Sequence, residues 1–180
     1  KGYKEATVYV SGKSKAELGG GVCQVASTIY YAAMYADLDI VQRTEHQYIV
    51  TYVPGGLDAT VYWGSLDFQF KNSTDYPIRI DASVSDGYVH ITFVGTETKD
   101  YTVELDYEIT AWFNSEEKII DISPDMPNYD QYKNYKEGDV IQTAYDGANV
   151  TTYMYKYDKD GNLISKEVVC YSKYDRRDRE

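Results

Sequence analysis

The sequence contains few residues of the kinds that cross-link chains or bind metal ions. Its 180 residues include two cysteines, Cys23 and Cys170, and two histidines, His46 and His90. Two cysteines are too few for a disulfide scaffold, and no CxxC or HxxxH spacing of zinc ligands occurs. We therefore expect neither a structural zinc site nor any other cofactor.

Positive charge and long apolar runs are also scarce. The 29 acidic residues outnumber the 18 basic ones, which gives a net charge of -11. This charge excludes nucleic acid as a partner and disfavours adsorption to anionic lipid, because both need a basic face. No apolar run approaches the ~20 residues of a membrane-spanning helix. The chain starts at Lys1 without a methionine or a signal peptide. We therefore expect an excised piece, with any export signal or membrane anchor upstream.

Tyrosine, by contrast, is abundant, with 21 residues against 4 phenylalanines. A tyrosine side chain joins a large apolar ring to a polar tip. One interpretation places these residues at half-buried positions of β-sheets, and another makes them platforms for sugar rings. The overall composition, 43% hydrophobic and 26% charged, is that of a soluble chain able to bury a core.

The pattern of apolar and turn residues predicts an α+β fold. One main helix packs on a mostly antiparallel sheet, and a smaller, elongated all-β domain follows. Apolar residues recur at helical spacing over 22–36, and the polar stretch at 95–100 predicts a boundary between domains at 1–97 and 98–180. Strands are expected at 6–10, 48–53, 59–63, 66–71, 77–83, 88–94, 101–113, 117–122, 139–143, 148–157 and 163–171, with a turn at 11–13 and a frayed or truncated tail at 173–180.

The most informative local feature is the cysteine that follows three glycines at the predicted helix start. Cys23 lies in the first turn, where the positive end of the helix dipole lowers a thiol pKa and favours the thiolate. The turn that contains Gly20, Gly21 and Gln24 has free backbone N–H groups, which form a candidate oxyanion hole and substrate contact. The alternative is a buried structural cysteine, with glycines that only make a tight turn.

A nucleophilic cysteine also needs a base, and His46 is the candidate for it. His46 precedes a predicted strand, whereas His90 fits an outward position in the strand at 88–94. Asp58 begins the next predicted strand and is the first candidate to orient the imidazole, with Asp67 as the second. The order Cys, His, Asp is similar to that of papain-like and transglutaminase-like enzymes. The alternatives are a surface loop histidine and an aspartate that caps a turn or strand.

Three ordered segments of the first half carry a family resemblance. They are 19–30 (GGGVCQVASTIY), 52–61 (YVPGGLDATV) and 70–78 (FKNSTDYPI). Together they resemble the signature of the VanW-like family over about residues 1–95. The family's motif residues fall here on Gly19, Gly20, Gly21, Cys23, Gln24, Thr28, His46, Pro54, Asp58, Asp67 and Asn72. The chain departs from the family at Thr44 and Glu45, where a second histidine is common.

The resemblance implies an extracellular protein associated with the cell envelope of a Gram-positive bacterium. The family is named from a gene in a vancomycin-resistance cluster, and the resemblance implies no particular biochemical activity. The half at 98–180 resembles a small all-β domain named for five glycines, with Gly138, Gly147 and Gly161 at matching places. This second resemblance implies adhesion to wall sugars, and the alternative is an extended spacer.

Two functions of different classes follow for a protein whose partner is peptidoglycan. The first is a cysteine acyltransferase or hydrolase of stem peptides, with Cys23 as nucleophile, His46 as base and Asp58 as the orienting residue. The second is a non-catalytic wall-binding or adhesion module in which Cys23 is structural. Metal binding at His46 with Glu45 or Asp58 is a third hypothesis, and a weaker one, because one histidine with scattered acids is a poor ligand set.

Overall fold

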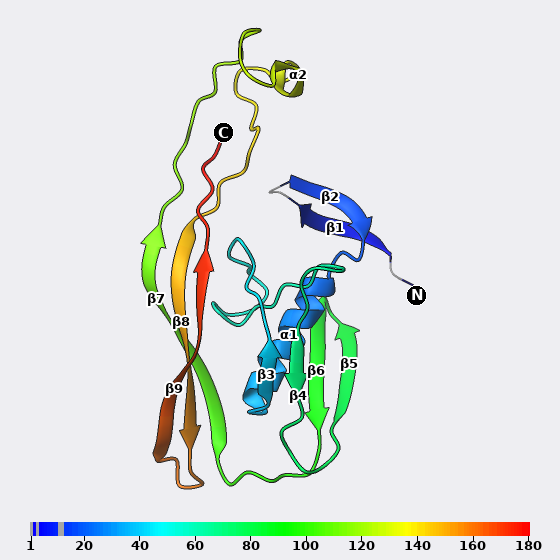
Figure 1. Ribbon diagram of the computed structural model, residues 1–180, viewed down its shortest axis with the longest axis vertical. Coiled ribbons are helices and arrows are strands. Elements are labelled where there is room, and N and C mark those ends of the chain that lie inside the picture. The colour runs from blue at the N-terminus through cyan, green and yellow to red at the C-terminus, as the bar shows by residue number, and fades with distance from the viewer. Residues whose placement is uncertain (1, 3, 11–12) are drawn as a thin grey trace.

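The structure, a computed structural model, describes residues 2, 4–10 and 13–180 (Figure 1). Within them, every ladder between named strands is antiparallel. The predicted class is confirmed: one main helix packs on antiparallel strands, and a three-stranded antiparallel sheet follows. The elements are β1 (Glu5–Val10), β2 (Lys13–Leu18), α1 (Val22–Tyr35), β3 (Asp39–Gln42), β4 (Gln69–Lys71), β5 (Arg79–Ser85), β6 (Tyr88–Val94), β7 (Thr102–Phe113), α2 (Tyr129–Tyr132), β8 (Gly147–Tyr157) and β9 (Leu163–Tyr174).

Helix α1 begins where three consecutive glycines let the chain turn sharply. Gly21 is its N-cap residue and has a left-handed φ of 88°, a conformation open mainly to glycine. At Gly20 an added Cβ would overlap Ala6 of β1, so the β1–β2 hairpin lies directly against the helix start. The buried side of α1 includes Tyr30. The helix predicted over 22–36 is confirmed to within one residue.

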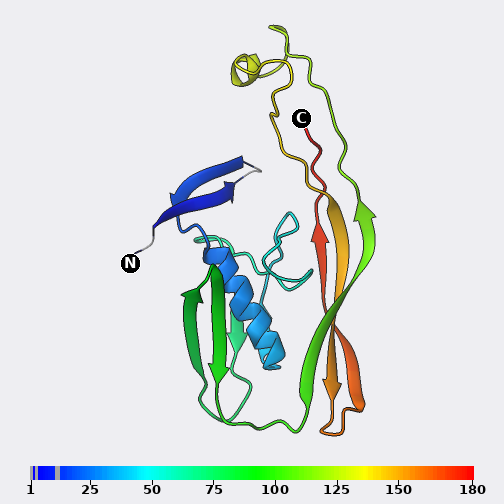
Figure 2. The ribbon, with the colours of Figure 1, turned by 180° about the vertical axis from the view of Figure 1, so that it is seen from behind.

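A row of aromatic rings connects α1 to the two short sheets beside it. Tyr30 meets Phe68 edge to face, with ring centroids 5.5 Å apart, and Phe70 stacks on both Phe68 and Phe93. Figure 2 shows α1 lying across β4, β5 and β6 on this side of the molecule. The strands predicted at 77–83 and 88–94 correspond to β5 and β6, which pair as a hairpin.

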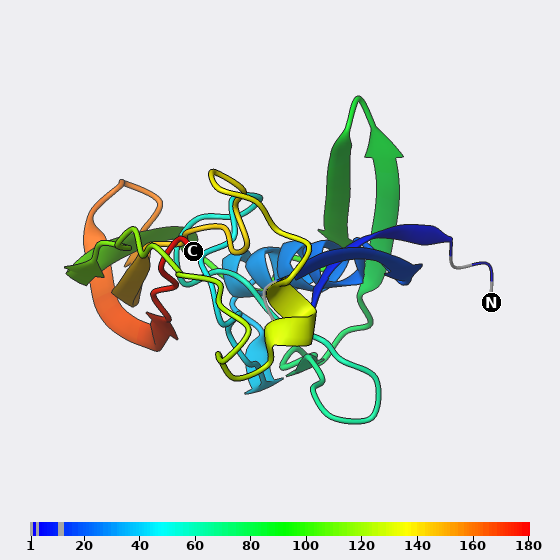
Figure 3. The same ribbon diagram turned by 90° about the horizontal axis from the view of Figure 1, so that it is seen from above.

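The three-stranded sheet β7–β8–β9 lies on the other side of α1, as the view from above shows (Figure 3). Met154 of β8 is only 4% exposed and joins a buried cluster with Tyr30, Met34, Leu57 and Ala59. The two halves of the chain therefore share apolar contacts across α1. The division into domains at 97/98 remains a prediction.

Four of the predicted strands do not form: 48–53, 59–63, 117–122 and 139–143. The chain at 43–68 runs instead as an irregular loop, and β3, which pairs with β4, was not predicted. Alternating apolar residues favoured strands in this loop, but its backbone groups bond at isolated points. Thr60 N, for example, donates to Thr44 O at 2.8 Å. Isolated contacts of this kind produce no alternating pattern of apolar and polar residues, so the local sequence does not reveal them.

The chain at 114–146 extends beyond the sheet and carries α2 at its tip (Figure 1). The tail was expected to be frayed or truncated, and the expectation of fraying was wrong: Arg177 and Asp178 are each 8% exposed, and Glu180 O accepts a hydrogen bond from Ile141 N at 2.7 Å. The turn expected at 11–13 lies largely outside the described residues.

In the part of the chain that the structure describes, neither helix has the length and apolar character needed to cross a membrane.

Candidate functional site

The structure brings Cys23, His46 and Asp58 together between α1 and the irregular loop. Cys23 is half-buried in the first turn of α1, and its Sγ donates to Val61 O at 3.4 Å. The thiol and the imidazole of His46 lie near enough for each to shift the pKa of the other. The Nδ1 of His46 lies 2.6 Å from Asp58 Oδ2. The three predicted residues are therefore neighbours, and their catalytic roles remain a prediction.

Asp58 is the centre of a buried hydrogen-bond network. Its side-chain Oδ2 accepts the backbone N–H of His46 at 2.7 Å as well as the ring nitrogen. Its Oδ1 accepts Arg43 Nη2 at 2.9 Å and Tyr174 OH at 2.5 Å. Burial raises the pKa of Asp58, but these donors and the charge of Arg43 outweigh it and hold the pKa below its usual range. The carboxylate is therefore ionised although it is fully buried.

The electrostatics of the site favour an ion pair between a thiolate and an imidazolium. Burial raises the pKa of Cys23, but hydrogen bonding to His46 and the charge of the imidazole lower it, and the net shift is downward. For His46, burial lowers the pKa whereas Asp58 and Cys23 raise it, to about 9. At neutral pH the imidazole is protonated and the thiol loses its proton more readily than a free cysteine does.

The start of α1 presents backbone N–H groups next to the thiol. The N–H groups of the first and fourth helical residues donate to glycine carbonyls of the turn. Those of Cys23 and Gln24 have no acceptor among the residues that the structure describes. Of the predicted contact residues, Gly21 is exposed, while Gly20 and Gln24 are half-buried. Two free amides beside a thiol have the arrangement that binds an oxyanion.

A buried serine ties α1 to the segment that carries Asp58. Ser27 is 0% exposed, and its Oγ accepts the N–H of Ala59 at 2.9 Å. The same hydroxyl has two acceptors in range, Cys23 O at 2.8 Å and Ala59 O at 3.2 Å. Ser27 thereby fixes the spacing between the turn of Cys23 and the residue that follows Asp58.

Tyr52 covers the solvent side of His46. Its hydroxyl lies 3.2 Å from His46 Nε2, and the two rings meet edge to face. Because Nδ1 is bound to Asp58, Nε2 is the nitrogen available to Cys23, and Tyr52 competes for it. Burial raises the pKa of Tyr52 to about 12, so its hydroxyl is neutral. Tyr52 is 38% exposed, which places this side of the imidazole near solvent.

The remaining sequence candidates lie elsewhere. Asp67 accepts hydrogen bonds from Phe68 N and Gln69 Nε2, so its contacts are local. His90 is exposed in β6, at the outward position that the sequence predicted. Its ring nitrogen forms a side-chain hydrogen bond with Ser85. Over the described residues, no group of three or more His, Cys, Asp or Glu side chains is arranged to hold a metal ion.

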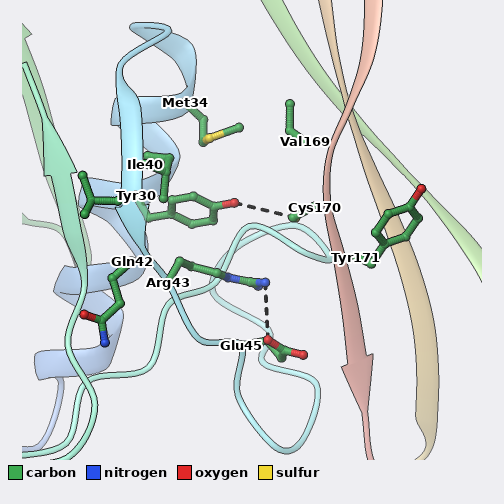
Figure 4. A pocket seen from close by; sticks show the side chains of 10 residues that line it. Tyr30, Met34, Ile40, Gln42, Arg43, Glu45, Val169, Cys170 and Tyr171 are labelled. Atoms are coloured by element: carbon green, nitrogen blue, oxygen red, sulfur yellow. Dashed lines mark hydrogen bonds and ion pairs between the residues drawn. The ribbon is translucent and has the colours of Figure 1, made fainter. Parts of the chain in front are cut away.

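A cavity of about 310 Å³ lies on the far side of Arg43, between β3 and β9 (Figure 4). In this view Tyr30 points toward Cys170, and Arg43 points toward Glu45. The guanidinium donors of Arg43 are already bound to Asp58, to Gly56 O and to a serine of β9. Arg43 thus forms a wall between this cavity and the buried carboxylate.

The protein is therefore an α+β protein in which a cysteine, a histidine and an aspartate lie together at the start of a helix. Within that class, the chain belongs to the family described as VanW like protein, whose model matches residues 1–94. The matched region contains the three clustered residues and the whole of α1. The resemblance of the second half to a five-glycine domain remains a prediction.

Two bacterial proteins are similar to part of the chain. It is 46% identical over 97 residues to "Uncharacterized protein YoaR" of Bacillus subtilis. The aligned region covers 54% of this chain and 32% of that protein. The chain is 30% identical over 91 residues to "Vancomycin B-type resistance protein VanW" of Enterococcus faecalis, covering 47% of this chain and 32% of the relative. The chain thus spans about a third of the length of these relatives. No solved structure matches it.

Sequence reasoning missed three residues of the site. Arg43 precedes His46 by three positions, and a lone basic residue in a half-buried segment was the available signal. Ser27 lies one turn after Cys23, where a buried polar residue on an apolar stripe was the signal. Tyr174 lies 116 residues beyond Asp58, and nothing in the sequence connects them.

Proposed function

We propose that this chain carries the active site of a cell-envelope cysteine acyltransferase or hydrolase. The observation that carries the proposal is the cluster of Cys23, His46 and Asp58, in which the imidazole bonds the carboxylate through Nδ1 and interacts with the thiol. A thiolate beside an imidazolium is the nucleophile of many acyl-transfer enzymes.

The reaction follows from this arrangement. The thiolate of Cys23 attacks the carbonyl carbon of an amide, a C–S bond forms, and the carbonyl electrons move to oxygen. The N–H groups of Cys23 and Gln24 stabilise that oxyanion. The C–N bond then breaks, and His46 Nε2 gives its proton to the leaving amine. Water or an acceptor amine attacks the thioester and passes a proton to His46, which releases the thiolate and restores the starting pair.

The substrate we propose is the stem peptide of peptidoglycan. Membership of the VanW-like family and the name of one relative, a vancomycin resistance protein, support a cell-envelope setting. They also support an extracellular location in a Gram-positive bacterium. The acidic net charge of -11 fits a peptide substrate better than an anionic polymer.

The first test measures the rate at which iodoacetamide alkylates Cys23 as a function of pH. Peptide mapping separates Cys23 from Cys170, so both thiols are followed in one sample. At about pH 6 we expect Cys23 to react at least about tenfold faster than a cysteine in an unfolded peptide, because its lowered pKa increases the fraction of thiolate. A rate no higher than that of the peptide overturns the proposal.

The second test looks for the acyl intermediate. The protein is mixed with synthetic stem peptides, and its intact mass is recorded after rapid acid quench. We expect a thioester adduct on Cys23 in the wild type, none in Cys23→Ser, and a strongly reduced amount in His46→Gln. An adduct that persists in Cys23→Ser excludes this thiol as the nucleophile.

A second candidate function is a non-catalytic wall-binding module, and the outer face of β8 favours it. Tyr153, Tyr155 and Tyr157 alternate along this strand, with neighbouring ring centroids 6.4 and 6.5 Å apart. Lys166 lies over the rings of Tyr153 and Tyr155. Such a row of rings is suited to stacking on sugars.

Sedimentation with purified cell walls tests this candidate. Tyr153→Ala combined with Tyr155→Ala is expected to weaken binding while Cys23→Ser leaves it intact. Tyr88→Ala, which removes an exposed ring from β6, is the matched control. Equal binding by the double variant and the control contradicts a role for this face.

A further inference from the structure

One residue of the C-terminal sheet reaches into the site. Tyr174, at the end of β9, is 2% exposed. Its hydroxyl donates to Asp58 Oδ1 at 2.5 Å and accepts the backbone N–H of Gly56 at 2.9 Å. Both hydrogen bonds are buried, so the hydroxyl joins the Asp58 segment to β9 at a fixed point.

The loop that carries His46 also runs along the end of β9. Arg43 Nη1 donates to Ser172 Oγ at 2.9 Å, and Asp175 N donates to Gln47 O at 2.7 Å. These contacts lie on either side of His46 in the sequence. The position of the imidazole loop therefore depends on a strand that begins 117 residues after His46 and lies outside the region matched by the family.

The two oxygens of Asp58 have different partners. Within the described part of the chain, Oδ2 accepts only from His46, through the backbone N–H and the ring. Oδ1 accepts from Arg43 and Tyr174, which come from two different parts of the fold. Two donors on Oδ1 fix the plane of the carboxylate, and that plane aims Oδ2 at the imidazole.

We propose that Tyr174 is a positioning residue for the reaction assigned to Cys23, and that the C-terminal sheet thereby completes the site. The proposal rests on the proposed function. Tyr174 does not touch the thiol. It acts by holding Asp58 so that His46 Nδ1 is bound and Nε2 faces Cys23. The sheet then contributes to catalysis through Tyr174, in addition to any role as a spacer or binding surface.

The experiment compares Tyr174→Phe with the wild type in the full chain, using the pH dependence of Cys23 alkylation by iodoacetamide. Loss of the hydroxyl frees the carboxylate to rotate and weakens the ion pair. We expect the rate at about pH 6 to fall about tenfold. At about pH 10 the rates should converge, because the thiol ionises there without help. Tyr171→Phe, on the same strand with a 74% exposed ring, should follow the wild type.

The outcomes separate the two proposals. A wild-type thiol no faster than a peptide cysteine overturns the proposed function before Tyr174 is considered. A fast wild-type thiol with an unchanged pH profile in folded Tyr174→Phe leaves the function standing and overturns the positioning role. A uniform change at every pH also overturns it, because a purely structural effect does not depend on thiol ionisation.

A second variant covers the case in which Tyr174→Phe does not fold. Site-specific 3-fluorotyrosine at position 174 keeps the hydroxyl and makes it a stronger donor to Asp58. The carboxylate then stays in place but carries less charge, so it stabilises the imidazolium of His46 less, and the alkaline limb of the alkylation profile should move to lower pH. The same substitution at Tyr171 is the control. Identical profiles at the two positions overturn the proposal.

Discussion

Asp58 joins charged and polar partners that come from distant parts of the chain. Arg43 follows β3, His46 lies in the loop, and Tyr174 ends β9. The charge of Arg43 balances that of Asp58, and in the proposed ion pair the imidazolium of His46 is balanced by the thiolate of Cys23. The cluster can remain ionised while half-buried or buried because its charges sum to zero and are hydrogen-bonded.

The first prediction concerns removal of that central charge. In Asp58→Asn the amide nitrogen faces donors whichever way the side chain turns, and Arg43 keeps only its longer ion pair with Glu45, at 3.6 Å. We expect the free energy of unfolding to fall by about 3–5 kcal/mol, measured by urea denaturation. Asp81→Asn is the control, because its partner Arg79 is 70% exposed, and it should cost less than about 1 kcal/mol. Equal losses would contradict the buried network.

Cys23 and His46 have pKa shifts of opposite sign, and this fixes how stability depends on pH. Between the ordinary pKa of His46, 6.5, and its folded value of about 9, the unfolded chain holds a neutral imidazole and a thiol. In the proposed ion pair the folded chain holds an imidazolium and a thiolate instead. Both states bind one proton, so the pair contributes no slope of stability with pH in this window.

The second prediction removes one partner of the pair. In Cys23→Ser, the effect of Cys23 on the pKa of His46 is lost but the raising effect of Asp58 remains, so the folded state still binds more protons than the unfolded state above pH 6.5. The stability from His46 is then complete below pH 6.5 and is lost as pH rises through its folded pKa. Urea unfolding at about pH 6.5, 7.5 and 8.5 should show a fall in Cys23→Ser and a flat profile in Cys170→Ser. Parallel profiles would exclude the ion pair.

At the scale of elements, the sequence predicts those whose signals are local. α1 has an apolar stripe at helical spacing and a glycine start, and the β5–β6 hairpin has Asp86 and Gly87 between two apolar runs. The loop at 43–68 has no such signal, because its course depends on Arg43 contacts that reach as far as Ser172. For the same reason the motif residues of the site were found and their distant partners were missed.

The third prediction concerns the contact between this loop and β8. Gly56 has a left-handed φ of 77°, and a Cβ there would overlap the hydroxyl of Thr152. We expect Gly56→Ala to cost about 2–4 kcal/mol of unfolding free energy, from overlap and backbone strain together. Thr152→Ala alone should cost about 1 kcal/mol, because among the described residues its buried hydroxyl has no hydrogen-bond partner.

The double variant separates the two causes. In Gly56→Ala combined with Thr152→Ala the overlap is removed, so the share of the unfolding free energy lost to overlap should be recovered. In a double-mutant cycle this recovery appears as a coupling energy of at least about 1 kcal/mol. The strain of the left-handed backbone remains in both. Additive losses would mean that Gly56 is required only for its backbone conformation and that β8 does not press on the loop.

At the scale of the whole molecule, the site and the C-terminal sheet share their support. Met154 of β8 packs with Tyr30 of α1 and with Leu57, which immediately precedes Asp58. Lys156 of β8 pairs with Asp37 at the end of α1 at 2.9 Å. Apolar and charged contacts thus join the sheet to both the helix and the loop, and these contacts favour cooperative unfolding of the chain over independent unfolding at 97/98.

The fourth prediction tests this cooperativity by amide hydrogen exchange. Met154→Ala removes a buried side chain from β8 and should lower the opening free energy by about 2–5 kcal/mol. If the chain is one unit, amides of α1 lose as much protection as amides of β8, although the substitution lies in the other half. Val84→Ala, at a 75% exposed position of β5, should change neither. Loss of protection confined to β7–β9 would establish that 1–97 and 98–180 unfold separately. The site would then retain its helix and loop while losing Tyr174, so the reactivity of Cys23 at about pH 6 would fall with the sheet.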